Sequence, residues 1–316
     1  MYGSIGTMAI SEIELTTNQA ILGIVPDEKR LLPKYLYYYL QFHKKELIGK
    51  GRGGTQQNLN ANMMKEYPIS YPSLPEQKRI VMLLEKAEKL KGFRADADKL
   101  TDELLKSVFY EMFGDPIKNG KKWGKKQIGD ITESRLGKML DAKKQTGKNK
   151  CKYLRNTNVK WNHFDFTELL EMDFDSDERI ELTLKKGDLL ICEGGEVGRC
   201  AIWNNELPDC YFQKALHRVR CQTDKILPEY LLRVFWRYSD YNGFRDIVHS
   251  STITHLTGVV LRKIEVPLPP ISHQKKFAEL VRIIEELENK QVSSKQSIDD
   301  LFNALMQKAF RGELIA

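Results

Sequence analysis

The amino-acid sequence predicts an α+β protein that is built twice: two globular domains, the first of them partial, separated by two long helices. The first observation is an internal repeat. YPSLPEQKRIV at residues 71–81 matches PLPPISHQKKFA at residues 267–278, and Gln77 aligns with Gln274. The other two observations are heptad patterns that follow each of these segments and short β-like runs between them.

The repeat continues upstream in the same order, with only short slips. LPKYL at residues 32–36 matches LPEYL at 227–231, and GSIGTMAI at 3–10 matches GEVGRCAI at 195–202. Ordered self-similarity of this kind indicates duplication. Met1 corresponds to about residue 193 of the second copy, so the first copy lacks the part that its twin has before that point.

Residues 75–113 are the first expected long helix, with Gly114 as its stop, and a second helix ends at Gly312. Arg94 and Thr101 interrupt the first apolar seam. Because each stripe is narrow, we expect the two helices to pack on each other; the alternative is that each packs on its own globular domain. The two seams comprise Ile80, Leu83, Ala87, Leu90, Ala97, Leu104 and Val108, and Phe277, Leu280, Ile284, Leu287, Ile298, Leu301 and Leu305.

The residues outside these helices alternate short β-like runs with glycine-containing turns, and one helix is expected at 228–240 with a twin at 33–45. This pattern is typical of an α+β domain. The expected division is residues 1–72 for the partial first domain, 73–114 for the first long helix, 115–270 for the complete second domain and 271–316 for the second long helix.

Composition narrows the classes of protein. The net charge of +7 and the pI of about 8.9 permit a polyanionic partner. Five cysteines without C-x-x-C spacing argue against a disulfide framework and a zinc module, and favour a reducing, cytoplasmic compartment. We find no secretory leader and no apolar run long enough to span a membrane.

The motifs of common enzymes are also missing from the sequence. It contains no phosphate-cradling G-x-x-x-x-G-K-[ST] loop, no H-E-x-x-H and no G-x-S-x-G. The amino-methyltransferase tetrad N/D-P-P-Y/F is absent as well. A nuclease or methyltransferase with its own active site is therefore the weaker reading, and no catalytic residue, metal ligand or cofactor is expected.

Basic and amide side chains recur on turns in both copies. Arginine and lysine neutralise phosphates, glycine lets the backbone approach them, and asparagine and glutamine pair with adenine edges. Each residue taken alone fits a solvated surface, but their clustering favours nucleic acid. The candidate DNA-binding residues are Arg52, Thr55, Gln56, Gln57, Asn58, Lys143, Lys144, Arg155, Asn156, Asn158, Arg199, Lys214, His217, Arg218, Ser251, Thr252 and His255.

The chain resembles the specificity (S) subunits of type I restriction–modification systems over essentially its whole length. The resemblance rests on the helix openings PSLPEQKRIVMLLEKAEKL and PPISHQKKFAELVRIIEEL and on the ending LFNALMQKAFRGEL. GSIGTMAI, GEVGRCAI, NQAI and GGTQQNLN add to it.

This resemblance implies two target-recognition domains separated by conserved helices packed as an antiparallel coiled coil. Each domain would read one half of a bipartite site in double-stranded DNA, and the subunit would be non-catalytic and without a cofactor. The helices would dock methyltransferase (M) subunits, two of them, and restriction (R) subunits would complete the complex. Methylation with S-adenosylmethionine and ATP-driven cleavage would belong to those partners.

The departure from the family pattern is the shortened first domain. It suggests self-association through that domain, or complementation by another fragment. A further alternative is a coiled-coil scaffold fragment without sequence specificity of its own.

Overall fold

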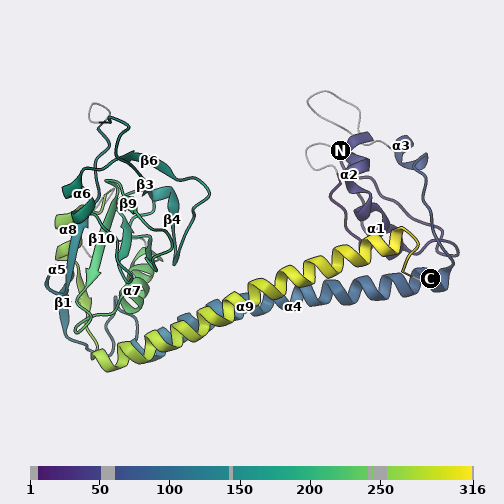
Figure 1. Ribbon diagram of the computed structural model, residues 1–316. Coiled ribbons are helices and arrows are strands. Elements are labelled where there is room, and N and C mark those ends of the chain that lie inside the picture. Colours follow the sequence, from purple (N-terminus) through teal and green to yellow (C-terminus); the bar gives the residue numbers. More distant parts are fainter. Residues whose placement is uncertain (1–5, 51–60, 142–144, 241–243, 245–254, 315–316) are drawn as a thin grey trace. The chain divides into compact units, whose positions relative to one another are not determined.

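The structure is a computed structural model, and it describes residues 6–50, 61–141, 145–240, 244 and 255–314. The chain divides into two compact units, Met1–Leu100 with Leu287–Ala316, and Thr101–Glu286. Each unit contains a part of both long helices (Figure 1). The predicted α+β class and its two long helices are confirmed.

A four-stranded antiparallel sheet is the central layer of the second unit. Its strand order is β2-β10-β7-β8, so β10 pairs with a neighbour on each side. Leu216 and Val219 of β10 are buried apolar residues, and they point to opposite faces because strand side chains alternate. The strands are β2 (Thr132–Leu136), β7 (Leu189–Cys192), β8 (Cys200–Ile202) and β10 (Leu216–Cys221).

One face of this sheet packs against a three-stranded sheet of order β6-β3-β9. Leu216, Leu190 and Trp203 join Phe174 and Phe212 in the apolar core between these layers. Short antiparallel ribbons, β1 with β11 and β4 with β5, complete the strands. The bounds are β1 (Lys125–Gln127), β3 (Lys150–Leu154), β4 (Val159–Lys160), β5 (His163–Phe164), β6 (Leu170–Asp173), β9 (Cys210–Phe212) and β11 (Glu265–Pro267).

The other face of the four-stranded sheet is covered by helices. Val219 and Ile191 belong to a core that also takes in Tyr230 and Phe235 of α7 and Leu261 of α8. The predicted helix at 228–240 is confirmed as α7. The helices of this unit outside the long pair are α5 (Ile128–Ile131), the 3₁₀ helix η2 (Asn156–Asn158), α6 (Ser176–Glu181), α7 (Pro228–Asp240) and α8 (Gly258–Lys263).

The first unit has a smaller core built on helices. Tyr35 and Leu36 pack with Ile80 and Leu84 of one long helix and Met306 of the other. The described residues 6–32 contain no helix or strand. The helices are α1 (Pro33–Phe42), α2 (Lys44–Lys50) and α3 (Ala61–Lys65), so the helix predicted at 33–45 ends earlier and is followed by a separate one.

The long helices are α4 (Leu74–Phe113) and α9 (Ile271–Phe310), and they lie side by side in opposite directions (Figure 1). In the first unit, Lys91 Nζ lies 2.7 Å from Asp299 Oδ1. In the second unit, the rings of Phe109 and Phe277 have centroids 5.6 Å apart. Pairing low numbers on α4 with high numbers on α9, and the reverse, defines an antiparallel pair.

The duplication is visible as repeated hydrogen bonds. Gln77 Nε2 donates to the carbonyl oxygens of Arg30 and Pro72, and its Oε1 accepts from the amide of Leu32. Gln274 makes the same three bonds to Lys225, Pro269 and Leu227. Both side chains are fully buried. Each glutamine therefore clasps the turn before α1 or α7 to the start of a long helix.

Matching glycines also share one backbone conformation. Gly6 and Gly198 have φ of 81° and 82°, and the helix-ending Gly114 and Gly312 have φ of 75° and 77°. These values lie in the left-handed region, which glycine enters without the clash that a Cβ causes. The two predicted helix stops are confirmed.

The predicted seam is wrong at alternate positions. Leu84 and Leu105 are buried, whereas Leu90 and Leu104 are 44% and 49% exposed. On α9, Leu280, Leu287 and Leu301 are likewise exposed, and Val281 is buried instead. Each helix carries two adjacent apolar stripes, so a heptad pattern alone does not choose between them. The globular cores determine which stripe is buried, because Leu84 packs into the core of the first unit and Leu105 into that of the second.

Across the described part of the chain, every helix is too short or too polar to cross a membrane.

Candidate nucleic-acid interface

Loops that are far apart in the sequence meet at one place in the second unit. The amide of Glu193 donates to the carbonyl oxygen of Ala215 at 2.9 Å, and the amide of Leu256 donates to that of Glu193 at 2.6 Å. The side-chain amide of Asn156 donates to the carbonyl oxygen of Gly194 at 3.0 Å. We call the loops at 137–139, 155–161, 193–199, 213–215 and 255–257 the loop cluster.

Arg199 is held from two sides within the loop cluster. Its Nη2 donates to the carbonyl oxygen of Asn156 at 2.9 Å, and its Nη1 lies 3.0 Å from a carboxylate oxygen of Glu196. The indole Nε1 of Trp161 donates to the other oxygen of Glu196 at 2.6 Å. The guanidinium group is therefore positioned before any ligand binds, and its side chain remains 20% exposed.

The 137–139 loop approaches its neighbour so closely that only glycine fits. A Cβ built on Gly137 would lie 2.4 Å from the carbonyl oxygen of Gln213. The amide of Lys214 donates to the carbonyl oxygen of Lys138 at 2.7 Å. This contact places the exposed side chain of Lys214 beside the exposed Met139.

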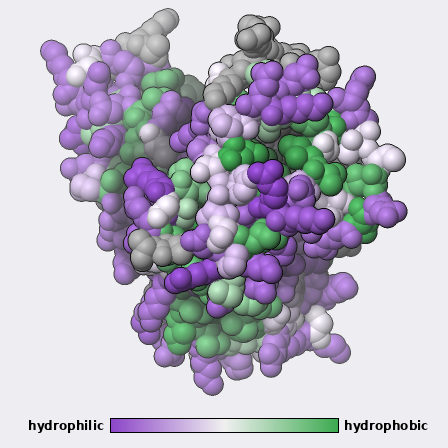
Figure 2. Space-filling model, turned by 90° about the vertical axis from the view of Figure 1, so that its right-hand side faces the viewer, coloured by the Kyte–Doolittle hydropathy of each residue, from purple (hydrophilic) through white to green (hydrophobic). Residues whose placement is uncertain are grey.

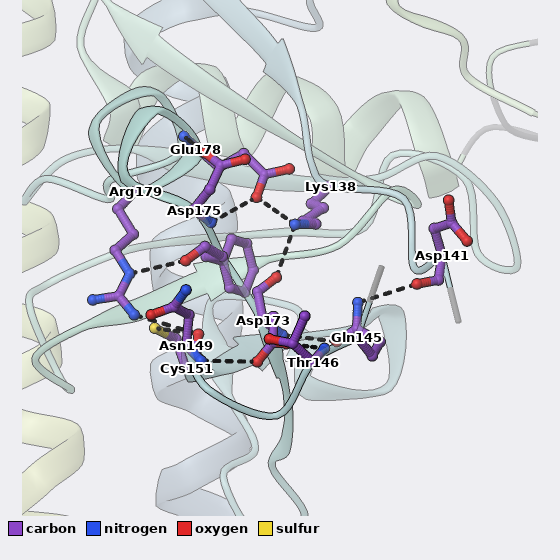
Figure 3. A network of polar contacts seen from close by, with 11 residues as sticks. Lys138, Asp141, Gln145, Thr146, Asn149, Cys151, Asp173, Asp175, Glu178 and Arg179 are labelled. Carbon is purple, nitrogen blue, oxygen red and sulfur yellow. Dashed lines mark hydrogen bonds and ion pairs between the residues drawn. The ribbon is translucent and has the colours of Figure 1, made fainter. Parts of the chain in front are cut away.

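Asp173, the last residue of β6, holds residues 146–149, which follow the 137–139 loop along the chain (Figure 3). Its carboxylate accepts from the amides of Gly147 at 2.7 Å and Asn149 at 3.1 Å, and from both the amide and the hydroxyl of Thr146. Burial raises the pKa of Asp173, but these hydrogen bonds outweigh it and hold the pKa below its usual value.

Lys138, in the 137–139 loop, is also bound to Asp173 of β6. Its Nζ donates to the carbonyl oxygen of Asp173 at 2.8 Å and also pairs with Glu178 (Figure 3). The cation lies 5.2 Å from the ring centroid of Phe174. Lys138 is therefore committed to contacts inside the protein, although its type and its place beside Gly137 suggest a phosphate contact.

The structure brings five of the sequence-predicted residues to the loop cluster or its rim. Lys214 and His255 are exposed, and Asn156 and Arg199 are partly exposed. Arg155 is also partly exposed, with its Nη2 2.9 Å from Glu168. These residues span 100 positions of the sequence, and they lie together because of the hydrogen bonds described above.

Three other predicted residues have buried side chains with structural contacts. The side-chain amide of Asn158 donates to the carbonyl oxygens of Asp165 and Glu168. His217 Nε2 lies 2.8 Å from the carbonyl oxygen of Leu256, and burial lowers its pKa. Arg218 donates to Glu133 and to two backbone carbonyls.

Nine predicted residues lie outside the described residues: Arg52, Thr55, Gln56, Gln57, Asn58, Lys143, Lys144, Ser251 and Thr252.

Trp161 and Gly194 contribute to the loop cluster and were not among the predicted residues. Glycine and tryptophan carry no charge, and only the nearby GEVG turn marks this region in the sequence. Within the described ranges, no group of three or more histidine, cysteine or acidic residues is arranged to hold a metal ion. Burial raises the pKa of Cys192, next to the cluster, to about 11, so its thiol stays protonated at neutral pH.

Comparison with known proteins assigns the class. A family model described as "Type I restriction modification DNA specificity domain" matches residues 1–94 and 120–300. The chain therefore belongs to this family and is a non-catalytic specificity component rather than an enzyme.

The curated relatives are specificity subunits by name. The Type I restriction enzyme MjaVIII specificity subunit of Methanocaldococcus jannaschii is 22% identical over 300 residues, which cover 89% of this chain and 70% of the relative. The Type I restriction enzyme EcoKI specificity subunit of Escherichia coli (strain K12) is 26% identical over 332 residues, which cover 94% of this chain and 69% of the relative.

Solved structures agree on the fold. The HsdS subunit from Thermoanaerobacter tengcongensis matches 91% of this chain and 72% of its own, with a TM-score of 0.52 and 20% identity. The S subunit of a type I system from M. genitalium matches 90% of this chain and 74% of its own, with a TM-score of 0.55 and 16% identity.

Proposed function

We propose that this specificity subunit binds double-stranded DNA through the loop cluster of the second unit. The observation that carries the proposal is the convergence of Arg199, Lys214, Asn156 and His255 on hydrogen-bonded loops. Lys214 is free to neutralise a phosphate, and the fixed guanidinium of Arg199 loses little freedom on binding. The exposed edge of His255 adds a donor or acceptor for a base or a phosphate.

The target is bipartite in this proposal. Residues 115–270 act as one target-recognition domain, and residues 1–72 contribute to the other. The predicted contacts of the first domain, at residues 52–58, lie outside the described residues. The duplicated glutamine clasps support equivalent roles for the two units, because they hold equivalent turns on equivalent helix starts.

The long helices are the proposed docking sites for two methyltransferase (M) subunits. Leu90, Phe93, Leu100 and Leu104 of α4 are exposed at heptad spacing, beside the buried seam. An apolar stripe that the partner helix leaves uncovered is suited to a protein partner. The M subunits bring S-adenosylmethionine chemistry, and restriction (R) subunits complete the complex. The chain acts in the cytoplasm, where its cysteines remain unpaired.

The test is methylation mapping in cells. The chain is co-expressed with a cognate M subunit, and modified adenines are mapped by long-read sequencing. We expect a defined motif, and we expect Arg199→Ala together with Lys214→Ala to reduce its modification at least ~10-fold, because each lost contact costs on the order of 1–3 kcal/mol.

Lys186→Ala is the matched control, because Lys186 is exposed at the opposite end of β7 from Glu193. Equal losses in the control and in the loop-cluster variant would contradict the assigned surface. A stable complex that methylates without any motif would instead identify a coiled-coil scaffold without sequence specificity.

A further inference from the structure

Met139, in the 137–139 loop, and Leu140, which follows it, are apolar residues with exposed fractions of 62% and 53%. Exposed apolar side chains are common on proteins, and Figure 2 shows several green patches of them on one face of the molecule. Exposure alone therefore marks no site. This pair differs because its members are adjacent. Outside the long helices, the other exposed large apolar residues in the described part of the second unit are isolated: Leu170, Ile180 and Val259.

The backbone is held on both sides of this pair (Figure 3). Before it, Lys138 Nζ donates to the carbonyl oxygen of Asp173 at 2.8 Å. After it, Gln145 Oε1 accepts from the amide of Asp173 at 2.8 Å, and Gln145 Nε2 donates to the carbonyl oxygen of Asp141 at 3.3 Å. The apolar pair therefore leaves a segment that is bound to β6 before and after it. A ligand that covers a backbone held in this way pays little for ordering it.

A cation lies directly beside the apolar pair. Lys214 Nζ is 3.9 Å from Met139 Sδ, and the Lys214 side chain is exposed. Under the proposed function, Lys214 neutralises a DNA phosphate. Because the base edges in a groove lie beside the phosphates that line it, a phosphate on Lys214 brings base edges within reach of Met139 and Leu140.

The major groove offers an apolar side chain one suitable partner. Every base pair presents hydrogen-bond donors or acceptors there, and thymine alone adds an apolar group, its C5-methyl. The thioether of Met139 is at most a weak acceptor, and the side chain of Leu140 forms no hydrogen bond. Covering a polar base edge with them would cost free energy, whereas covering a methyl group is favourable.

We infer that Met139 and Leu140 form a methyl-reading contact that selects thymine in the DNA bound by the second unit. The inference rests on the proposed function, because it requires the loop cluster to bind DNA, and it adds base selection to it. Lys214 contacts the phosphate, and the apolar pair contacts the base. Loss of Lys214 should therefore weaken binding to every sequence, whereas loss of the pair should remove the preference at a thymine position.

The test compares thymine with uracil, which lacks only the methyl group. The complex of the full chain with its M subunits is titrated by fluorescence anisotropy into duplexes that carry the motif found by methylation mapping. Each thymine of the motif is replaced in turn by uracil. We expect at least one replacement to weaken binding by the wild type ~4-fold, the value of one buried methyl group. In the variant with Met139→Ala and Leu140→Ala, that replacement should have no effect.

Ile180→Ala is the matched control, because it removes an exposed apolar side chain of α6 outside the loop cluster. This variant should respond to uracil as the wild type does, and uracil placed outside the motif should leave binding unchanged. The inference is overturned if every uracil duplex binds the wild type as tightly as the thymine duplex. It is also overturned if the double-alanine variant keeps the wild-type response to uracil.

A separate variant distinguishes this inference from the proposed function. If Arg199→Ala with Lys214→Ala binds the motif as the wild type does, the proposed function fails and the methyl-reading contact with it. If that variant is impaired while the uracil duplexes bind like the thymine duplex, only the methyl-reading contact fails. A double-alanine variant of Met139 and Leu140 that no longer assembles with the M subunits would place the pair in a protein interface and overturn the inference.

Discussion

At the scale of single residues, Gln77 and Gln274 define the repeat better than any apolar position does. Each is fully buried, and each satisfies three backbone groups that no other side chain reaches in the described structure. The sequence alignment pairs them, but it cannot show that they are enclosed. A glutamine in the first turn of a helix reads as a solvated residue until the turn that packs over it is known.

Replacing Gln274 with alanine should destabilise the second unit by about 3 kcal/mol. The amide of Leu227 and the carbonyls of Lys225 and Pro269 would remain buried without their partner, which costs more than the net value of the hydrogen bonds. Thermal or urea unfolding measures the change. Gln296→Ala is the control, because Gln296 is exposed and its side chain bonds to the exposed Asp300. Equal effects of the two substitutions would contradict the clasp.

His217 should make the stability of the second unit depend on pH. Burial lowers its pKa below the ordinary value of 6.5, so below that pH the unfolded chain binds a proton that the folded chain resists. The free energy of unfolding should therefore be fully retained above pH 6.5 and fall as the pH drops toward the folded pKa.

Unfolding of the wild type and of His217→Gln at pH 7.5 and pH 5 separates this effect from other titrating groups. The wild type should lose more stability than the variant over this interval. An identical loss in both proteins would show that His217 does not contribute.

At the scale of elements, the sequence predicts where the long helices lie but not which stripe they bury. Proline, glutamate and glycine mark the ends of α4, and these act locally, so the predicted bounds agree with the structure. The seam depends on what each helix packs against. Phe109 and Phe113 contact Tyr230 of α7, and no heptad pattern contains that information.

Neighbouring leucines on α4 test the buried seam directly. Leu105→Ala should lower the free energy of unfolding by about 2–4 kcal/mol, because Leu105 is 3% exposed and its removal leaves a cavity. Leu104→Ala should change it by less than about 0.5 kcal/mol, because Leu104 is 49% exposed. Urea unfolding compares the two variants at constant composition. A larger loss for Leu104 would restore the seam predicted from the sequence.

The candidate site is partly predictable from the sequence, less so than the helix ends and more so than the buried stripe. Its basic and amide residue types could be chosen from the sequence, but their grouping could not. Arg199 and Asn156 are 43 residues apart and meet because one accepts the hydrogen bond of the other. Neighbouring side chains such as His217 and Arg218 point to opposite faces of a strand, but both faces of β10 are covered, so neither side chain reaches the surface.

At the scale of the whole molecule, the net charge of +7 should appear as a salt-dependent affinity for DNA. The logarithm of the binding constant of the assembled complex should fall linearly with the logarithm of the salt concentration. Lys214→Ala should lower the magnitude of this slope by about 1, as the loss of one phosphate contact requires. Fluorescence anisotropy on a DNA duplex measures it, with Lys186→Ala as the control. An unchanged slope would remove Lys214 from the proposed interface.

The contact of Phe310 with Tyr35, at a ring-centroid distance of 5.5 Å, determines when the first unit can complete its core during translation. The second unit is one continuous stretch of chain, and all of its residues are translated before residues 287–316, which belong to the first unit. The first unit begins at the N-terminus, yet its core needs Met306 and Ala309. The part that is synthesised first is therefore completed last. Its aromatic side chains stay uncovered until the end of α9 is translated.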